Sequence, residues 1–294
     1  MNDQAQQLRE KLLRQSSAPS VLQHGSRKTK VVAVASGKGG VGKSNVALNF
    51  ALGLLQEGQR VVVMDLDVGF GNIDVLLGIS SQKNIVDLID KGLSIWDIIE
   101  KGPNGLQFIA GGSGLSQIFQ LDEKKLQYFF EQLALLQGYA DVIILDIGAG
   151  ISEKSLRFLL AADEILIVTT PEPTALTDAY ALIKMTHSRK PGVCFRVVVN
   201  RAASAKEGKF VADKLSLVSR QFLGLEVFSL GFMFDDVHVT RAVKKQQPFS
   251  LAYPSSKAAH SMRDLVRSYL QQENEQKKEA GMKGFISRLR SFWK

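Results

Sequence analysis

The sequence predicts an α/β fold, a mainly parallel, twisted sheet of about seven or eight strands with helices on both faces. Seven short apolar runs, rich in β-branched residues, alternate with helical stretches along residues 30–277. Such alternation gives parallel strands joined by crossover helices that cover both faces of the sheet. A glycine-rich turn joins the first run to the first helix, and two later runs end in aspartate. Ligands of such sheets bind at the carboxyl ends of the strands, so we expect a site there.

The predicted elements follow from periodicity. The expected strands are Val31–Ala35, Arg60–Met64, Leu106–Ala110, Asp141–Leu145, Glu164–Thr169, Cys194–Val199 and Glu226–Gly231. The expected helices are 44–56, 123–137, 152–162, 174–188, 206–223 and 256–277.

The turn from Ser36 to Ser44 reads Ser-Gly-Lys-Gly-Gly-Val-Gly-Lys-Ser, which fits the phosphate-loop pattern G-x-x-x-x-G-K-[ST]. Glycines there let the backbone turn its N–H groups toward one point, and the helix N-terminus adds partial positive charge. Lys43 can reach the outer phosphates of a nucleotide, and the Ser44 hydroxyl can bind Mg²⁺. The expected nucleotide-binding residues of the loop are Gly37, Lys38, Gly39, Gly40, Val41, Gly42, Lys43, Ser44 and Asn45.

Carboxylates follow two of the predicted strands. Asp65 ends the second strand and Asp67 lies two residues on, so both point out of the core toward the phosphate loop. Asp146 ends the apolar run Val142–Leu145, which is the usual Walker B arrangement. A carboxylate in that place should reach Mg²⁺ through water.

Lys38 is a second lysine inside the loop, which a simple phosphate loop does not need. With it, the stretch Lys38–Ser44 resembles the deviant Walker A loop of the MinD and ParA class of P-loop ATPases. The resemblance implies ATP and Mg²⁺ as ligands, slow ATP hydrolysis as the reaction, and catalytic roles for Lys38, Lys43 and Asp67. It also implies an ATP-dependent homodimer in which Lys38 touches the nucleotide held by the partner.

The resemblance extends to both switch segments. Asp65-x-Asp67-x-x-x-Gly71-Asn72 is similar to the first switch of MinD-type ATPases, which implies that Asp67 orients the attacking water and Asp65 holds the Mg²⁺ hydration shell. The expected metal-binding residues are therefore Ser44, Asp65 and Asp146. The second switch of the family usually reads Asp-x-Pro-Ala-Gly, whereas glycine stands at position 148 here. We expect the missing proline to make this loop more flexible.

Three further stretches are similar to the family's contacts with the base and the dimer. Asn200 and Arg201 match an adenine-reading Asn-Arg pair, and an amide can offer adenine both a donor and an acceptor. Glu172 lies in a Pro-Glu turn that resembles the one at the family's dimer seam. Phe234 and Asp236 stand where the family has a Pro-Glu-Asp loop near the base, with phenylalanine in place of the proline.

Composition describes a neutral body with two basic ends. The net charge is +8; residues 1–30 hold six bases against two acids, and residues 281–294 hold four bases and no acid. An acidic target, membrane or nucleic acid, is then plausible for the ends. A single cysteine, Cys194, excludes an intrachain disulfide. The polar N-terminus predicts no secretory signal, and no apolar run reaches the roughly 18 residues that cross a bilayer.

The ends form separate segments of the predicted organisation. Residues 1–15 can form a short partner-activating helix, 16–29 read as a linker, and 30–277 form the ATPase domain. Residues 278–294 place one apolar arc opposite basic side chains, which fits an amphipathic helix on an anionic membrane. Packing of that helix onto the protein's own body is the alternative. The arc includes Phe285, Ile286, Leu289, Phe292 and Trp293.

The N-terminus distinguishes between branches of the class. Asp3-Gln4-Ala5-Gln6-Gln7-Leu8-Arg9 resembles an element of the flagellar MinD-like ATPases called FlhG, YlxH or FleN. The resemblance implies that Asp3, Gln4, Ala5, Leu8 and Arg9 stimulate the signal-recognition-type GTPase FlhF. It further implies control of flagellum number and placement, flagellar switch-complex (C-ring) partners, and a cytoplasmic protein that joins the membrane when ATP-bound. A division-site MinD-type or a DNA-segregating ParA-type ATPase is the alternative, although nucleic acid is not the expected partner.

Overall fold

The predicted fold class is confirmed by the computed structural model, which describes residues 28–67, 72–112, 121–150, 152–275 and 281–292. Eight strands form one sheet in the order β3-β4-β2-β5-β1-β6-β7-β8. All neighbouring strands are parallel except β3 and β4, which pair antiparallel at one edge. The strands are β1 (Lys30–Ala35), β2 (Val61–Leu66), β3 (Ile99–Lys101), β4 (Gln107–Ile109), β5 (Val142–Ile147), β6 (Glu164–Thr169), β7 (Cys194–Ala202) and β8 (Val227–Phe234).

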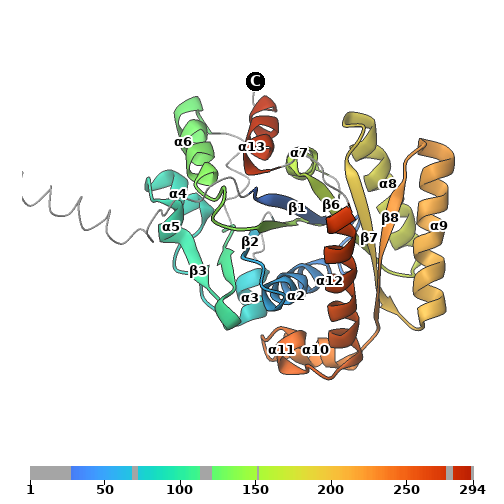
Figure 1. Cartoon of the computed structure of the whole chain (residues 1–294). Coiled ribbons are helices and arrows are strands. Elements are labelled where there is room, and N and C mark those ends of the chain that lie inside the picture. Colours follow the sequence, from blue (N-terminus) through green and yellow to red (C-terminus); the bar gives the residue numbers. More distant parts are fainter. Residues whose placement is uncertain (1–27, 68–71, 113–120, 151, 276–280, 293–294) are drawn as a thin grey trace, which may run out of the picture.

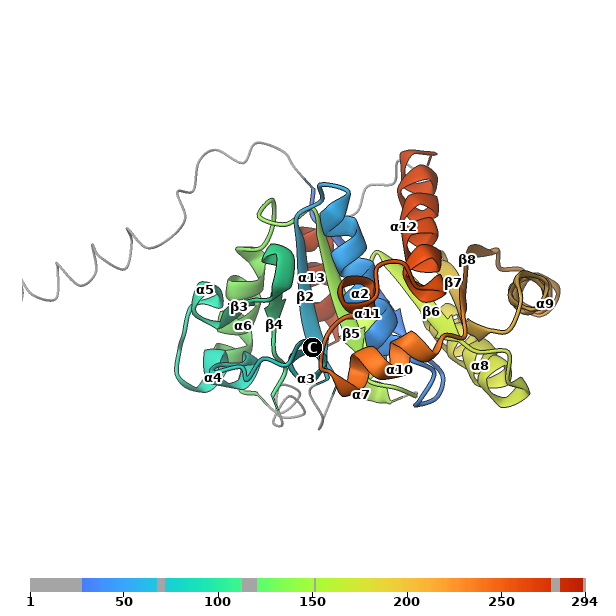
Figure 2. The same cartoon turned by 90° about the horizontal axis from the view of Figure 1, so that it is seen from below.

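Helices cover both faces of the sheet (Figures 1 and 2). One core lies beneath α4 (Ile85–Asp90), α5 (Ile95–Ile98), α6 (Glu123–Ala134), α7 (Glu153–Ala161), α8 (Pro173–Arg189), α9 (Ala205–Leu223) and α13 (Met282–Ser291). The other core lies beneath α2 (Lys43–Gln56), α3 (Ile73–Leu77), α10 (Val237–Lys244), α11 (Phe249–Ala252) and α12 (Lys257–Glu275). A short 3₁₀ turn, η1 (Pro103–Gly105), precedes β4.

Alternation along the central strand explains the two cores. In β1, Val31, Ala33 and Ala35 belong to the first core, while Val32 and Val34 belong to the second. Successive side chains of a strand point to opposite faces, so a strand with helices on both sides is apolar throughout. All seven strands that the sequence predicted are present in the structure. The structure adds the three-residue strand β3 and the short helices α3, α4, α5, α10 and α11.

A buried ion network lies where the parallel strands begin, at the opposite end from the phosphate loop. Glu164 at the start of β6 pairs with Arg196 of β7, and both side chains are almost fully buried. Lys30 at the start of β1 pairs with Glu164 and with Glu273 of α12. Buried charges are tolerated when they are paired, so this network fixes the last turns of α12 against the sheet.

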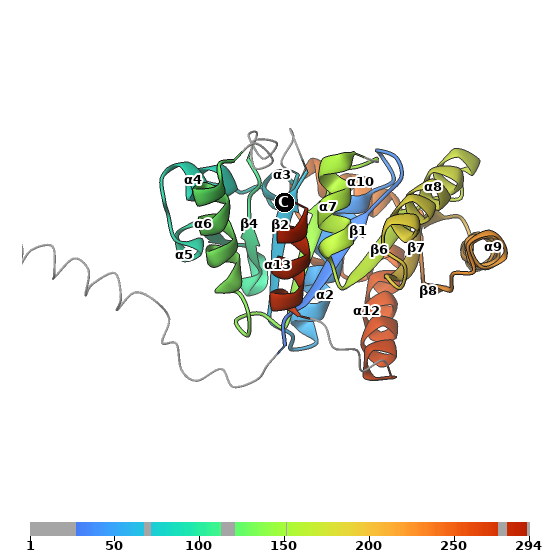
Figure 3. The ribbon, with the colours of Figure 1, turned by 90° about the horizontal axis from the view of Figure 1, so that it is seen from above.

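The C-terminal helix α13 packs onto the body of the protein. Its apolar residues Met282, Phe285, Ile286 and Leu289 are buried in the first core, and Phe292 is partly buried against it. The helix lies between α6 and α7 (Figure 3). In this conformation the helix therefore takes the alternative place, on the body of the protein, because an amphipathic arc does not reveal what covers it. Its attachment to a membrane stays a prediction. Trp293 lies outside the described residues.

None of the described helices combines the length and the apolar character needed to cross a membrane.

Candidate nucleotide-binding site

The phosphate loop joins β1 to α2 in the conformation that its glycines allow. Gly40 and Gly42 have φ angles of 79° and 87°, a region that favours glycine. A Cβ on Gly42 would lie 2.4 Å from Nδ2 of Asn200, and that amide donates to the Val41 carbonyl at 2.7 Å. A Cβ on Gly37 would lie 2.2 Å from the backbone of Asp178 in α8. The loop is thus held between β7 and the first turns of α8.

Lys43 connects the loop to the carboxyl end of β5. Its ammonium lies 2.6 Å from Oδ1 of Asp146, 3.9 Å from Oδ2 of Asp67 and 3.3 Å from the Ser44 hydroxyl. Lys43 and Asp146 are both buried, so each charge depends on the other. Oδ2 of Asp146 is buried and has no hydrogen-bond partner among the described residues.

Asp65 is held by the backbone of the segment that follows β2. It accepts hydrogen bonds from the N–H groups of Asp67 (3.0 Å), Asn72 (2.7 Å) and Ile73 (3.1 Å). Its neighbour across the sheet is Asp146. Burial, and then the charge of Asp146, raise the pKa of Asp65 to about 6 despite these hydrogen bonds. The two strand ends therefore concentrate negative charge, which a cation would relieve.

These residues fit a magnesium ion. Mg²⁺ prefers oxygen ligands and is usually bound through one or two carboxylates together with waters and substrate phosphates. The partnerless Oδ2 of Asp146 and the Ser44 hydroxyl are oxygens of this kind beside the phosphate loop. The described segments contain no cluster of three or more His, Cys, Asp or Glu side chains suited to a metal ion.

Asp67 lies at the mouth of the site and remains partly exposed. Its Oδ2 accepts a hydrogen bond from Nδ2 of Asn72 at 3.1 Å. Burial raises the pKa of the Asp67 carboxyl, and the charge of Lys43 opposes that rise. Its place between the phosphate loop and the end of β5 suits a side chain that positions a water molecule.

Lys38 pairs within its own chain and has other partners than Lys43. Its ammonium lies 2.5 Å from Oε2 of Glu172 and 3.0 Å from the Thr174 hydroxyl at the start of α8. The hydrogen bond from Lys38, followed by its charge, lowers the pKa of the Glu172 carboxyl. Both side chains are substantially exposed, and exposed ion pairs contribute little free energy. Lys38 can therefore leave Glu172 at small cost.

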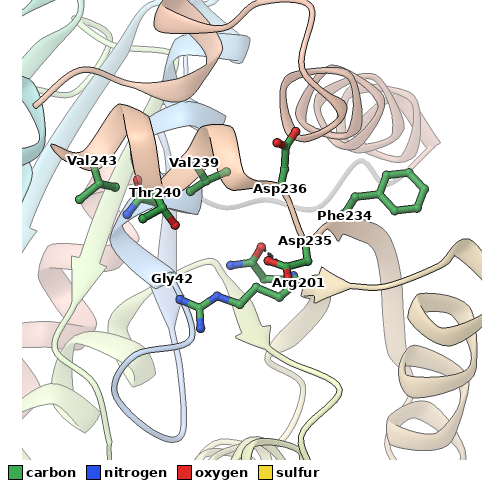
Figure 4. A pocket seen from close by; sticks show the side chains of 10 residues that line it. Gly42, Arg201, Phe234, Asp235, Asp236, Val239, Thr240 and Val243 are labelled. Carbon is green, nitrogen blue, oxygen red and sulfur yellow. Dashed lines mark hydrogen bonds between the residues drawn. The ribbon is translucent and has the colours of Figure 1, made fainter. Parts of the chain in front are cut away.

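A cavity of about 500 Å³ opens beside the loop (Figure 4). Asn200 and Arg201, at the end of β7, both line it, and Arg201 has a φ of 57°. Asn200 Oδ1 accepts from the Arg201 N–H at 2.9 Å, so the amide keeps one N–H and one lone pair for a base. The cavity is lined by Gly42, Asn45, Asn200, Arg201, Phe234, Asp235, Asp236, Val239, Thr240 and Val243.

Two of the predicted base contacts have other partners. Phe234 points away from the centre of the cavity in Figure 4 and packs edge-on against Phe232. Asp236 caps α10 by accepting from the His238 N–H at 2.9 Å, and its other oxygen accepts from the Ala258 N–H at 3.0 Å. The structure therefore favours packing and capping roles for this pair.

Sequence reasoning missed the wall that α10 contributes to the cavity, namely Val239, Thr240 and Val243, as well as Asp235 before it. Asp235 lies in the stretch compared with the family's base loop, so that comparison could have identified it. The sequence contains no sign of the wall that α10 forms, because this helix has eight residues and a single buried side chain, too few for a recognisable hydrophobic period. Asp3, Gln4, Ala5, Leu8 and Arg9 lie outside the described residues.

Comparison with known proteins finds relatives that agree with one another. The ParA family model, described as NUBPL iron-transfer P-loop NTPase, matches residues 27–269. Antiactivator FleN of Pseudomonas aeruginosa is 36% identical over 81% of this chain and 85% of its own length. Flagellum site-determining protein YlxH of Helicobacter pylori is 34% identical over 89% of this chain and 90% of its own.

Solved structures show the same fold. The cell division ATPase MinD of Pyrococcus furiosus superimposes with a TM-score of 0.67 at 20% identity, covering 83% of this chain and 99% of its own. The septum site-determining protein MinD of Pyrococcus horikoshii, complexed with Mg-ADP, also gives 0.67, at 21% identity, covering 85% of this chain and all of its own.

Replacing Gly42 with alanine should weaken ATP binding at least about tenfold, a loss of about 1.4 kcal/mol. The new Cβ would displace the Asn200 amide and with it the loop N–H groups. Titration with a fluorescent ATP analogue measures the effect. Gly58→Ala is the matched control, because Gly58 has a φ of 82° but no heavy atom within 4 Å of its would-be Cβ. Equal affinities of the two variants would contradict the contact.

Proposed function

Because the chain belongs to the MinD/ParA family of P-loop ATPases, we propose that it is an ATP-dependent dimerising switch that sets the number and placement of flagella. The observation that supports the switch is that the two lysines of the phosphate loop differ in burial and in partner. Lys43 is buried on the Asp146 carboxylate, while Lys38 is partly exposed and pairs with the exposed carboxylate of Glu172. One lysine serves the nucleotide of its own chain, and the other is free to serve a partner's.

In the proposed reaction, positioning and charge stabilisation provide most of the rate enhancement, as in phosphoryl transfer generally. The loop N–H groups and Lys43 would bind the β- and γ-phosphates, and Ser44 and Asp146 would hold Mg²⁺, with Asp65 beside them. When bound, Mg²⁺ would supply positive charge against the phosphate oxygens. Asp67 holds the attacking water in line with the γ-phosphate. Hydrolysis is slow and returns the protein to a monomer.

Dimerisation follows from the exposed position of Lys38. Two chains meet at their nucleotide sites, and each Lys38 exchanges Glu172 for the phosphates bound by the partner. A phosphate chain carries more charge than one carboxylate, and a closed interface excludes the water that weakens the Lys38–Glu172 pair. ATP therefore supplies the free energy that joins the two copies.

Asp67→Ala should remain dimeric in the presence of ATP and magnesium, because the water that ends the ATP state is no longer positioned. Size-exclusion chromatography with ATP and with ADP measures this, and we expect ATP turnover to fall at least about tenfold.

Asp90→Ala is the control, since Asp90 is an exposed carboxylate paired with Lys125 away from the phosphate loop. Lys38→Ala should stay monomeric with either nucleotide. An Asp67→Ala protein that stays monomeric with ATP would contradict the switch.

The flagellar role is supported by the identity to FleN and YlxH over most of the chain. We further propose that residues 1–15 stimulate the GTPase FlhF and that switch-complex (C-ring) proteins are additional partners. Both proposals rest on the likeness of Asp3–Arg9 to the element of the flagellar ATPases. In this proposal the monomer is cytoplasmic, and the N-terminal helix becomes ordered on its partner.

Deleting residues 1–15 should abolish stimulation of FlhF GTP hydrolysis while leaving ATP binding within twofold of the intact chain. Phosphate release from FlhF, with and without added protein, measures the effect. Within the segment, Leu8→Asp should lose stimulation and Gln6→Ala should retain it, because Leu8 lies on the apolar face of the expected helix. Full stimulation by the shortened chain would argue for a different branch of the family.

Membrane attachment requires α13 to leave its place on the body. In the docked position the Arg288 guanidinium donates to the Ala161 carbonyl at 2.7 Å and to Oδ1 of Asp163 at 2.5 Å. Asp163 is buried and also accepts from the Val31 N–H. We propose that this contact is the latch of α13, and that release exposes the apolar arc to an anionic membrane.

Helix α7 links the latch to the nucleotide. It begins just after the second switch loop, where the Gly150 N–H donates to the Ser36 carbonyl at 3.0 Å, and it ends at Ala161, whose carbonyl binds Arg288. A helix of nine residues spans about 13 Å, and we propose that α7 moves as a unit. ATP-induced movement of the switch loop would therefore reach the latch directly. Two released helices in a dimer bind far better than one.

Asp163→Asn should raise the liposome binding of the nucleotide-free protein severalfold, because Arg288 loses its charged partner and α13 undocks. Sedimentation with vesicles containing anionic lipid measures the bound fraction. Asp264→Asn is the control, since Asp264 forms an exposed ion pair with Arg267 on α12. Deleting residues 282–294 should abolish the gain, whereas binding that is unchanged in Asp163→Asn would exclude the latch.

A further inference from the structure

Gly148, the first residue after β5, lies directly beneath the Asp67 carboxylate. A Cβ built on Gly148 would lie 2.9 Å from Oδ1 of Asp67, 3.5 Å from its Cγ and 3.6 Å from its Cα. Carbon and carboxylate oxygen do not approach this closely without a shift of one of them. The space that a side chain would fill at position 148 is thus occupied by the Asp67 side chain.

The backbone does not explain this glycine. Gly148 is not among the residues with positive φ, so its conformation is open to alanine. Gly150 differs, since its φ of 82° favours glycine and its N–H is bonded to Ser36. The second switch loop is therefore shaped at Gly150, whereas Gly148 serves a neighbouring side chain.

Asp67 is held on its remaining sides by polar groups. Oδ2 accepts from Nδ2 of Asn72, and the Lys43 ammonium lies 3.9 Å away. With Gly148 below Oδ1, the carboxylate rests against the end of β5, close to the Asp146 strand terminus. In this place it faces the loop residues that would bind the phosphates.

We propose that Gly148 is a positioning residue for Asp67. Because Gly148 has no side chain, the Asp67 carboxylate can rest where it can orient the attacking water. The inference rests on the proposed role of Asp67 in ATP hydrolysis. It also gives the departure from the family's Asp-x-Pro-Ala-Gly pattern a different physical meaning. In this proposal the glycine provides room for a carboxylate.

Gly148→Ala tests the inference. The closest atom is the far end of a flexible side chain, so alanine should move the carboxylate by part of an ångström at little cost in stability. Misplacement of this size can slow an enzyme by up to about 100-fold. We expect kcat for ATP hydrolysis to fall about tenfold or more, with KM for ATP within twofold of the unchanged protein.

Gly102→Ala is the matched control. Gly102 has a φ of −95°, its would-be Cβ meets only ordinary contacts at 3.4 Å and beyond, and it directly follows the edge strand β3. Its kcat should be unchanged. A Gly148→Ala protein with unchanged kcat, or with KM raised in proportion to the loss of kcat/KM, would overturn the inference.

The double variant Asp67→Ala/Gly148→Ala separates the contact from a general effect on folding. With Oδ1 and Cγ removed, the nearest Asp67 atom to the new Cβ is its Cα at 3.6 Å, an ordinary contact. Any fall in melting temperature caused by Gly148→Ala should therefore disappear in the Asp67→Ala background. A fall that persists there would overturn the inference. If instead Asp67→Ala alone hydrolyses ATP at the normal rate, the proposed function fails, which is a separate result.

Discussion

The ion pair between Lys43 and Asp146 is the interaction on which the nucleotide end of the molecule depends. It joins the first residue of α2 to the carboxyl end of β5, and both charges are buried. A buried charge that loses its partner costs several kcal/mol, so neither residue can be released without a substitute. Phosphate can replace Asp146 as the partner of Lys43, but Asp146 then needs a cation of its own. If the chain binds ATP and Mg²⁺ as proposed, this exchange of partners would couple the binding of the two.

At the opposite end of the sheet, buried charges are likewise paired, but no ligand is proposed there that could replace either partner. Glu164, which begins β6, and Arg196 near the start of β7 form a buried pair, and Lys30 and Glu273 join them. The described chain therefore begins beside the end of α12, far along the sheet from the phosphate loop. The segments proposed to meet FlhF and the membrane both attach at this fixed end. In the proposed switch, a signal from the nucleotide would travel from the phosphate-loop end toward this end through α7.

The sequence was most informative where one physical requirement acts alone. Parallel strands covered on both faces must be apolar throughout, so β1, β5 and β6 were predictable from runs of Val, Ile and Leu. Asp146 was predictable because a carboxylate after such a run has to lie at the edge of the sheet.

Prediction from sequence failed where one residue pattern suits two different environments, or where contacts between distant parts of the chain determine the structure. Helix α10 has a single buried side chain and too few residues for a clear period, so the wall of the base cavity was missed. The sequence likewise could not show that a Cβ on Gly148 would lie 2.9 Å from Oδ1 of Asp67, because this is a contact between distant parts of the chain. The greater flexibility expected without the proline stays a prediction. The family resemblance was confirmed by the comparisons, whereas the proposed roles of individual residues are still predictions.

The C-terminal helix illustrates why one amphipathic arc can serve two surroundings. Burying a large apolar side chain stabilises a protein by about 1.5–3 kcal/mol, and a bilayer interior offers the same residues a similar gain. In the proposed membrane-bound state, Phe285, Ile286 and Leu289 would therefore exchange one apolar environment for another at a similar gain. The charged side chains of α13 therefore decide which of the two surroundings is favoured. Arg288 gains a buried carboxylate when docked, whereas each cation near an anionic leaflet gains about 1 kcal/mol. A single ion pair at the end of α7 can consequently determine which surface the helix covers.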